Sequence, residues 1–159
     1  MFFVVVALVL VVGFLAARMW IERASPRPQN LGVENGRFAP CPASPNCVST
    51  QASPDDTEHY ISAIPYNTDL ATAHDTIIQI IQQTPRTTII TNSPDYIYAE
   101  FRTPLWRFID DVEFYFDDEN KLIHFRSASR LGYGDMGTNR KRMEAIRTTF
   151  LRQSDNEGS

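Results

Sequence analysis

Arginines, small hydroxyl residues and glycines are concentrated in residues 126–142, which read RSASRLGYGDMGTNRKR. The run ends an expected strand, passes through a glycine-containing loop and opens an expected helix. Glycine permits left-handed backbone, and the amides at a helix start attract anions. Arginine adds charge-assisted hydrogen bonds to phosphate, sulfate or carboxylate. This composition indicates either a small-anion site or a rigid ionic joint between elements.

The ionic joint is the interpretation that we favour, because structural ion pairs outnumber functional ones. The expected strand register directs Asp110 inward, and a buried carboxylate requires a partner, for which an arginine of the following helix is the candidate. In the anion interpretation the ligand would lie near Gly132–Gly137, bound by Arg126, Arg130, Arg140 and Arg142. The whole candidate anion or ionic site comprises Asp110, Asp111, Glu113, Arg126, Ser127, Ser129, Arg130, Asp135, Asn139, Arg140 and Arg142.

The sequence predicts no catalytic residue, no metal ligand and no cofactor. Gly132–Gly137 matches G-x-G-x-x-G, but the strand before it belongs to an antiparallel meander rather than a βαβ unit, so we reject a dinucleotide site. Ser127 and Ser129 lie near His124 in the sequence, yet there is no G-x-S-x-G motif. A hydrolase is therefore a distant alternative, and a protein without enzymatic activity is favoured.

Turn residues separate four expected strands, at residues 86–92, 96–103, 108–117 and 121–130. Connections this short make neighbouring strands antiparallel. Pairing Phe116 with Ile123 also places Phe114 opposite Phe125, whereas a slip by one residue would mix the two faces of the sheet. The same register sets Val112 against Ser127, Asp110 against Ser129, Tyr115 against His124 and Glu113 against Arg126. One face is then apolar, with Ile97, Ala99, Phe101, Val112, Phe114, Phe116, Ile123 and Phe125. The other is polar and aromatic, with Tyr96, Tyr98, Glu100, Arg102, Asp111, Glu113, Tyr115, His124 and Arg126.

Two helices are expected to cover the apolar face. Residues 69–83 place apolar side chains at helical spacing, and a second helix runs from about Thr138 to Arg152. The predicted fold class is α+β: a four-stranded antiparallel meander with two helices packed on one face, preceded by an N-terminal transmembrane helix.

The transmembrane helix is expected at residues 2–21, which are apolar except for Arg18. A helix of this length rises ~30 Å, enough to cross the hydrocarbon core of a bilayer. The alternative is a cleaved signal peptide, which needs basic residues before the run and an A-x-A-like site, whereas Leu15-Ala16-Ala17 has Leu at the outer position. We favour a single-pass anchor.

Residues 22–57 are proline-rich and are expected to form a linker or coil with a Cys pair. They precede the α+β domain at residues 58–152 and a disordered tail at 153–159. A Cys41–Cys47 disulfide would persist only in an oxidising compartment, and two reduced thiols are the alternative. Arg18, Arg23 and Arg27 follow the uncharged run of residues 2–17, which by the positive-inside rule favours the cytoplasm for the domain. We expect an inner (cytoplasmic) membrane protein with a periplasmic domain.

The net charge of −4 argues against a nucleic-acid partner. Acidic side chains predominate over residues 55–119 and basic ones over residues 121–152. We interpret this asymmetry as mutual neutralisation within one fold.

Three blocks of sequence carry a family resemblance: PCPASPNCVSTQ at residues 40–51, FIDDVEF at 108–114, and RSASR with GDMGTNRKR within 126–142. Together they resemble the bacterial and plant family called domain of unknown function 1499, over roughly residues 35–152. The resemblance implies that Cys41, Asn46, Cys47 and all residues of the candidate site belong to the family's pattern. It also implies that residues 41–49 dock on the domain. It implies no activity, because the family has none assigned.

The expected function is that of a membrane-anchored, non-catalytic accessory or interaction domain. Its expected partners are the membrane, which it crosses once, and an envelope protein complex. The alternative is a domain that binds a small anion or a lipid headgroup at the arginine and glycine-loop site.

Overall fold

Four consecutive strands form an antiparallel meander: β3 (Thr87–Ser93), β4 (Tyr96–Arg102), β5 (Ile109–Asp117) and β6 (Leu122–Ser129). The structure, a computed structural model, describes residues 2–157. Phe116 pairs with Ile123, and Phe114 pairs with Phe125. The predicted register of this hairpin is therefore confirmed, and so is the α+β fold class.

The sheet has six strands rather than the four that the sequence predicts. β1 (Cys47–Ser49) and β2 (Ile64–Pro65) both pair with β6, and the main strand order is β1-β6-β5-β4-β3. These additional strands have 3 and 2 residues. Strands this short show no alternation that a sequence pattern can detect.

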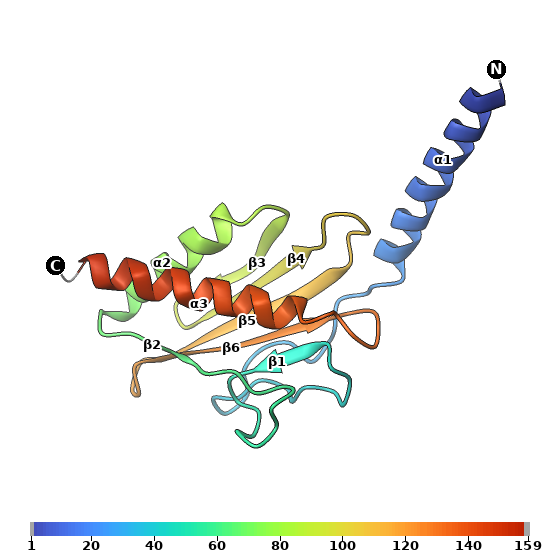
Figure 1. Cartoon of the computed structure of the whole chain (residues 1–159). Helices are drawn as coiled ribbons and strands as arrows, with labels where there is room; N and C mark the ends of the chain where they lie inside the picture. The colour runs from blue at the N-terminus through green and yellow to red at the C-terminus, as the bar shows by residue number, and fades with distance from the viewer. Residues whose placement is uncertain (1, 158–159) are drawn as a thin grey trace.

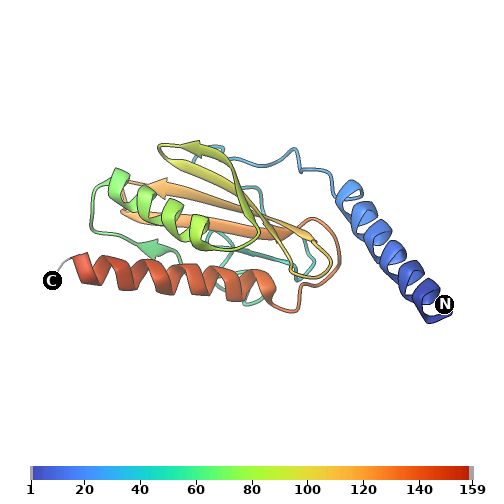
Figure 2. The same cartoon turned by 90° about the horizontal axis from the view of Figure 1, so that it is seen from above.

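The apolar face of the sheet packs against α2 (Leu70–Gln83) and α3 (Thr138–Glu157), which lie on the same side of it (Figures 1 and 2). Asp69 is the N-cap of α2, and its Oδ1 accepts a hydrogen bond from the Thr72 backbone N–H at 2.9 Å. α3 continues past Arg152, the expected end, and the tail expected at 153–159 is helical as far as Glu157. The last two residues of that tail lie outside the described part. The core contains all eight residues of the predicted apolar face: Ile97, Ala99, Phe101, Val112, Phe114, Phe116, Ile123 and Phe125.

The opposite face of the sheet is polar, and much of it is buried as well. Tyr98, Glu100, Asp111, Glu113 and Arg126 are all shielded from solvent. The chain between the first helix and β1 crosses this face, on the side away from α2 and α3 (Figure 2). The proline-rich segment is therefore packed on the sheet, although it contains little regular structure.

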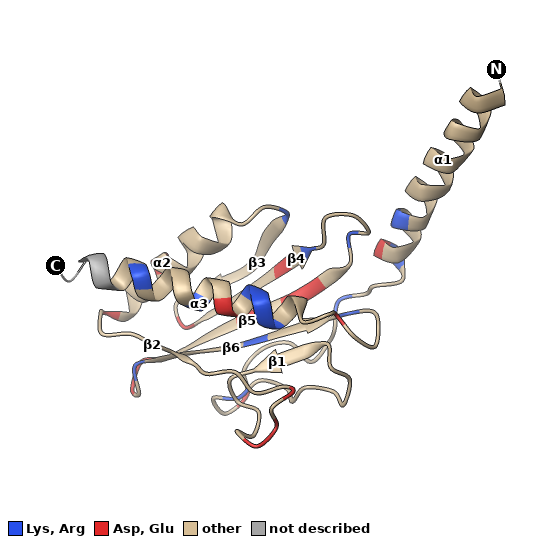
Figure 3. Ribbon diagram, viewed as in Figure 1, with Lys and Arg blue, Asp and Glu red and all other residues tan. Residues whose placement is uncertain are grey.

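α1 (Phe2–Arg23) projects from the domain (Figure 1). It is the one helix among residues 2–157 that is long and apolar enough to cross a membrane, with a mean hydropathy of 2.6, and a signal sequence meets the same criterion. Charged residues are confined to the half of α1 nearest the domain (Figure 3).

Candidate functional site

Asp110 and Asp111 are neighbours in β5, and because side chains alternate along a strand they lie on opposite faces of the sheet. The residues of the predicted site divide accordingly. Between the sheet and α3 lies the helix-side cluster, made of Asp110, Ser127, Ser129, Asn139 and Arg142. On the opposite face lies the coil-side cluster, made of Arg27, Tyr98, Glu100, Asp111 and Arg130. Glu113 and Arg126 form a further pair on that face.

An ion pair joins α3 to the sheet in the helix-side cluster. Arg142 Nη2 lies 2.5 Å from Asp110 Oδ2. Arg142 Nη1 donates to Asn139 Oδ1 at 2.7 Å and to Ser127 Oγ at 3.2 Å. The guanidinium also lies 4.9 Å from the centre of the Phe101 ring. An arginine of this helix is the partner predicted for Asp110 from the sequence, and Arg142 occupies that position.

Asn139 is almost completely buried and connects three segments of the chain. Its Nδ2 donates to the Asn46 carbonyl oxygen at 3.0 Å and to Ser129 Oγ at 2.9 Å, and its Oδ1 accepts from Ser127 Oγ. Asn46 directly precedes Cys47, whose disulfide with Cys41 has a Cα–Cα distance of 5.7 Å. α3 and β6 are thus tied to the disulfide loop.

Asp135 and Arg140, two further residues of the predicted site, act at the start of α3. Asp135 accepts hydrogen bonds from the backbone N–H groups of Gly137 at 2.9 Å and Asn139 at 2.6 Å, so it caps the helix. Arg140 Nη2 donates to three backbone carbonyl groups within residues 57–60, at 2.9 to 3.3 Å. Both side chains therefore hold local backbone in place.

Arg130 is the centre of the coil-side cluster. Its Nε donates to Asp111 Oδ2 at 2.9 Å, and its Nη2 lies 2.6 Å from Glu100 Oε1 and 2.7 Å from Asp111 Oδ1. Nη1 donates to the Ser25 carbonyl oxygen at 3.1 Å, and Tyr98 Oη accepts from Nη2 at 2.9 Å. Burial opposes the charged form, but the hydrogen bonds to Asp111 and Glu100 outweigh it and raise the pKa of Arg130.

Both carboxylate oxygens of Glu100 accept hydrogen bonds from arginines. Besides Arg130, Arg27 Nη2 lies 2.8 Å from Oε1, and Arg102 Nη2 lies 2.8 Å from Oε2. Burial would raise the pKa of the Glu100 carboxyl, but the hydrogen bonds from Arg27 and Arg130 lower it to about 2. Glu100 is therefore ionised at neutral pH, and it links β4 to the chain that follows α1.

Glu113 behaves differently although it lies on the same face. Its Oε1 accepts from Gly32 N–H at 2.7 Å and Tyr96 Oη–H at 2.8 Å, and Arg126 Nη1 lies 3.3 Å from Oε2. Burial raises the pKa of Glu113 in spite of these three donors. Arg126 Nε is buried and has no hydrogen-bond partner among the described residues. The hydrogen bonds of Glu113 thus offset the cost of its burial less completely than the arginines offset the burial of Glu100.

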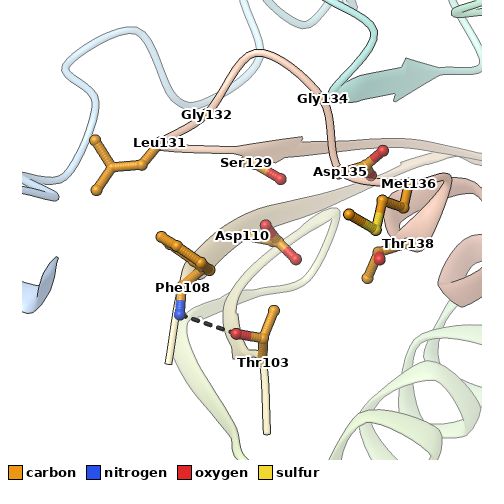
Figure 4. A pocket seen from close by; sticks show the side chains of 10 residues that line it. All are labelled: Thr103, Phe108, Asp110, Ser129, Leu131, Gly132, Gly134, Asp135, Met136 and Thr138. Carbon is orange, nitrogen blue, oxygen red and sulfur yellow. Dashed lines mark hydrogen bonds between the residues drawn. The ribbon is translucent and has the colours of Figure 1, made fainter. Parts of the chain in front are cut away.

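A cleft of about 230 Å³ lies beside the helix-side cluster. Its walls come from the β4–β5 loop (residues 103–108) and the β6–α3 loop (residues 130–137). Figure 4 shows Asp110 and Ser129 between Phe108 on one side and Met136 on the other. The cleft is mostly apolar, and its volume lies just below the ~300–1,000 Å³ of common ligand pockets.

The four arginines of the anion hypothesis do not meet in one place. Arg126 and Arg130 are buried on the coil side, where carboxylates bind them. Arg142 binds Asp110, and Arg140 binds backbone carbonyl groups. The cleft beside the glycine loop is instead lined by two carboxylates, Asp110 and Asp135. The arrangement matches a set of ionic joints more closely than an anion site.

The sequence profile of a protein family described as "Protein of unknown function (DUF1499)" matches residues 37–150. The chain belongs to the DUF1499 family. The helix-side cluster lies within the DUF1499 match, as do Glu100, Asp111 and Arg130, whereas Ser25 and Arg27 precede it. Comparisons with curated proteins and with solved structures gave no match.

Three contributors to these clusters were not in the site predicted from the sequence: Glu100, Tyr98 and Arg27. Glu100 and Tyr98 were assigned to the polar face of the sheet, where nothing indicated burial. The β4–β5 register, which was not predicted from the sequence, places Glu100 opposite Asp111 and would have supplied the signal of charge. Two acidic side chains on neighbouring strands need a shared cation, which Arg130 supplies. No pattern in the sequence marked Arg27 as a site residue, because it lies in a segment without periodicity.

Proposed function

We propose that this protein is a membrane-anchored, non-catalytic accessory or interaction domain that α1 holds directly against the membrane surface. One observation carries the proposal: the end of α1 is packed on the domain, without a free spacer between them. Ile21 is only 8% exposed, and Ser25 Oγ donates to the Ile21 carbonyl oxygen at 2.7 Å. The Ser25 carbonyl oxygen in turn binds Arg130 of the coil-side cluster.

Ionic contacts also hold the end of α1 against the domain. Glu22 Oε1 lies 3.8 Å from Arg102 Nε and 3.7 Å from Arg107 Nε. Surface ion pairs of this kind contribute little individually. Together with the contacts of buried Arg130 and half-exposed Arg27, they fix the direction in which the chain leaves α1. A domain attached this closely stays beside the bilayer and meets partners there.

The non-catalytic assignment is supported by how the candidate hydroxyl groups are used. Ser127 Oγ donates to Asn139 and accepts from Arg142, and Ser129 Oγ accepts from Asn139. Their side-chain hydrogen-bond partners are an amide and a guanidinium, neither of which is a general base at neutral pH. These hydroxyl groups therefore serve as hydrogen-bond bridges in the joint of α3.

We place the domain on the periplasmic side of the inner membrane, as part of an envelope complex. The support is the Cys41–Cys47 disulfide, since disulfides persist in oxidising compartments. Arg18, Arg23 and Arg27, at and just after the end of α1, favour the opposite side by the positive-inside rule. One of them, Arg27, forms an ion pair with Glu100. Its presence after α1 therefore has a structural explanation besides membrane orientation.

The test is thiol labelling of intact cells with a membrane-impermeant reagent, with and without prior reduction. We expect labelling only after reduction, from outside. A matched control is Cys47→Ser, which leaves Cys41 as a partly exposed thiol that should react from outside without reduction. Free thiols that react only after lysis would place the domain in the cytoplasm and overturn the placement. Release of a shortened protein from washed membranes would show a cleaved signal sequence and overturn the anchor.

A further inference from the structure

The β4–β5 loop exposes apolar side chains at its tip. Leu105 is 59% exposed and Trp106 is 41% exposed. The loop is nevertheless well held at its base, where Thr103 N–H donates to the Phe108 carbonyl oxygen and Phe108 N–H donates to Thr103 Oγ1, both at 3.0 Å. A fixed loop that presents Leu and Trp to water is a sign of an interaction surface.

The position of this tip relative to α1 indicates what it meets. The rings of Trp106 and Phe14 have centroids 5.4 Å apart. Phe14, Ala17, Arg18 and Ile21, which recur at helical spacing, are the partly or fully covered residues of the last three turns of α1. Phe14 precedes Arg18 by four residues, which is about 6 Å along a helix. Trp106 therefore lies beside the apolar part of α1, about one turn deeper in the bilayer than Arg18, which is expected at the membrane interface.

The β6–α3 loop extends the same surface. Tyr133 is 78% exposed and Met136 is 96% exposed. This loop faces the β4–β5 loop across the apolar cleft, as residues from both loops line it (Figure 4). Two neighbouring loops thus carry exposed apolar side chains at one end of the domain, and α1 leaves the domain beside one of them.

We propose that this end of the domain is a lipid-binding surface, in which Leu105 and Trp106 enter the bilayer interface and Tyr133 and Met136 rest on it. The inference rests on the proposed function, because it requires α1 to lie in a membrane. Tryptophan and tyrosine favour the bilayer interface, and arginine can reach the phosphate level while its stem stays in apolar surroundings. Arg107, at the base of the tip, has a partly exposed side chain suited to that position.

The chain contains two tryptophans, Trp20 and Trp106, which makes the surface measurable by fluorescence. Trp20→Phe leaves Trp106 as the single emitter, and Trp106→Phe leaves Trp20. The full chain is reconstituted in phosphatidylcholine vesicles that contain lipids brominated at different depths of the acyl chain. Iodide serves as the quencher from water.

We expect brominated lipids to quench Trp106, with the largest loss of emission for bromine near the headgroup, and iodide to have little effect. Leu105→Asp in the Trp20→Phe background should reverse both results, because a carboxylate at the tip opposes insertion. Tyr60→Phe in the same background is the control away from this surface, and should leave both results unchanged.

The two emitters separate the inference from the proposed function. Quenching of Trp20 by lipid without quenching of Trp106 would leave the anchor intact and overturn the lipid-binding surface. Absence of lipid quenching for both would overturn the anchor as well. Protection of Trp106 from lipid and iodide alike would show that α1 or a second copy of the chain covers the tip, which also overturns the inference.

Discussion

The helix-side and coil-side clusters lie on opposite faces of β5 and β6, and they are built in different ways. On the coil side, Arg130 is surrounded by Glu100, Asp111, Tyr98 and the Ser25 carbonyl oxygen, so its three nitrogens all have acceptors. On the helix side, Asp110 Oδ1 accepts no hydrogen bond from any residue in the range 2–157 and borders the cleft.

One pair of strands thus supports two separate joints, one on each face of the sheet. The helix-side cluster fixes α3, which completes the apolar core. The coil-side cluster fixes the segment that leaves α1, and so determines the direction in which α1 leaves the domain. Asp110 and Asp111 are adjacent in sequence but belong to different joints, and each can be altered without the other.

The largest expected effect is that of Arg130→Ala. The change leaves Asp111 buried without its cation, and breaking a buried ion pair in this way costs about 3–5 kcal/mol of unfolding free energy. The measurement is urea denaturation of the full chain in detergent, followed by the fluorescence of the two tryptophans. Arg152→Ala, at an exposed position of α3, is the matched control and should change stability by less than about 0.5 kcal/mol. Equal effects of the two variants would remove the basis for the coil-side joint.

Arg142→Ala should destabilise the protein less, by about 2–3 kcal/mol, because the cleft gives solvent access to Asp110 after the cation is lost. The double variant Asp110→Ala with Arg142→Ala sharpens the comparison. It should be more stable than the sum of the two single losses predicts, as expected for residues that interact directly. Strict additivity in the same denaturation assay would mean that the pair does not couple α3 to the sheet.

The smallest effect expected is a pH dependence specific to the coil side. The pKa of Glu100 is lowered from 4.5 to about 2. Its stabilising contribution is therefore present above the unfolded value and is lost as the pH falls from there toward the folded value. Between about pH 5 and about pH 3, the wild-type protein should lose more unfolding free energy than Glu100→Gln. The raised pKa of Glu113 acts with the opposite sign, but it is common to both proteins and cancels in the difference. Parallel pH profiles would contradict the assignment.

The sequence was sufficient for the parts of the fold that local patterns encode. The alternation in β5 and β6 determined their register, since only one pairing keeps Phe114 and Phe125 on the buried face. The inward position of Asp110 followed from the same register, and with it the expectation of an arginine partner from α3.

Other features depend on contacts between distant segments and have no periodic signature. β1 and β2 are too short to alternate, and they are strands only because β6 offers them an edge. The burial of Glu100 and Glu113 depends on Arg27 and Gly32, which approach from a segment more than 70 residues earlier in the chain. A polar face with aromatic residues is predicted to be solvent-exposed unless the segment that covers it is known.

The strand order carries a consequence for the sequence of folding events. β1 is the first strand in the chain, yet Cys47 pairs with Ala128 of β6, the last long strand to be synthesised. Contacts between such distant residues close a long loop, and they form later than local hairpins. The β5–β6 hairpin and the short Cys41–Cys47 loop can form from nearby residues alone. β1 must therefore wait, with α1 already made, until β6 emerges to pair with it, so a chain truncated before β6 would leave Cys47–Ser49 without a partner strand.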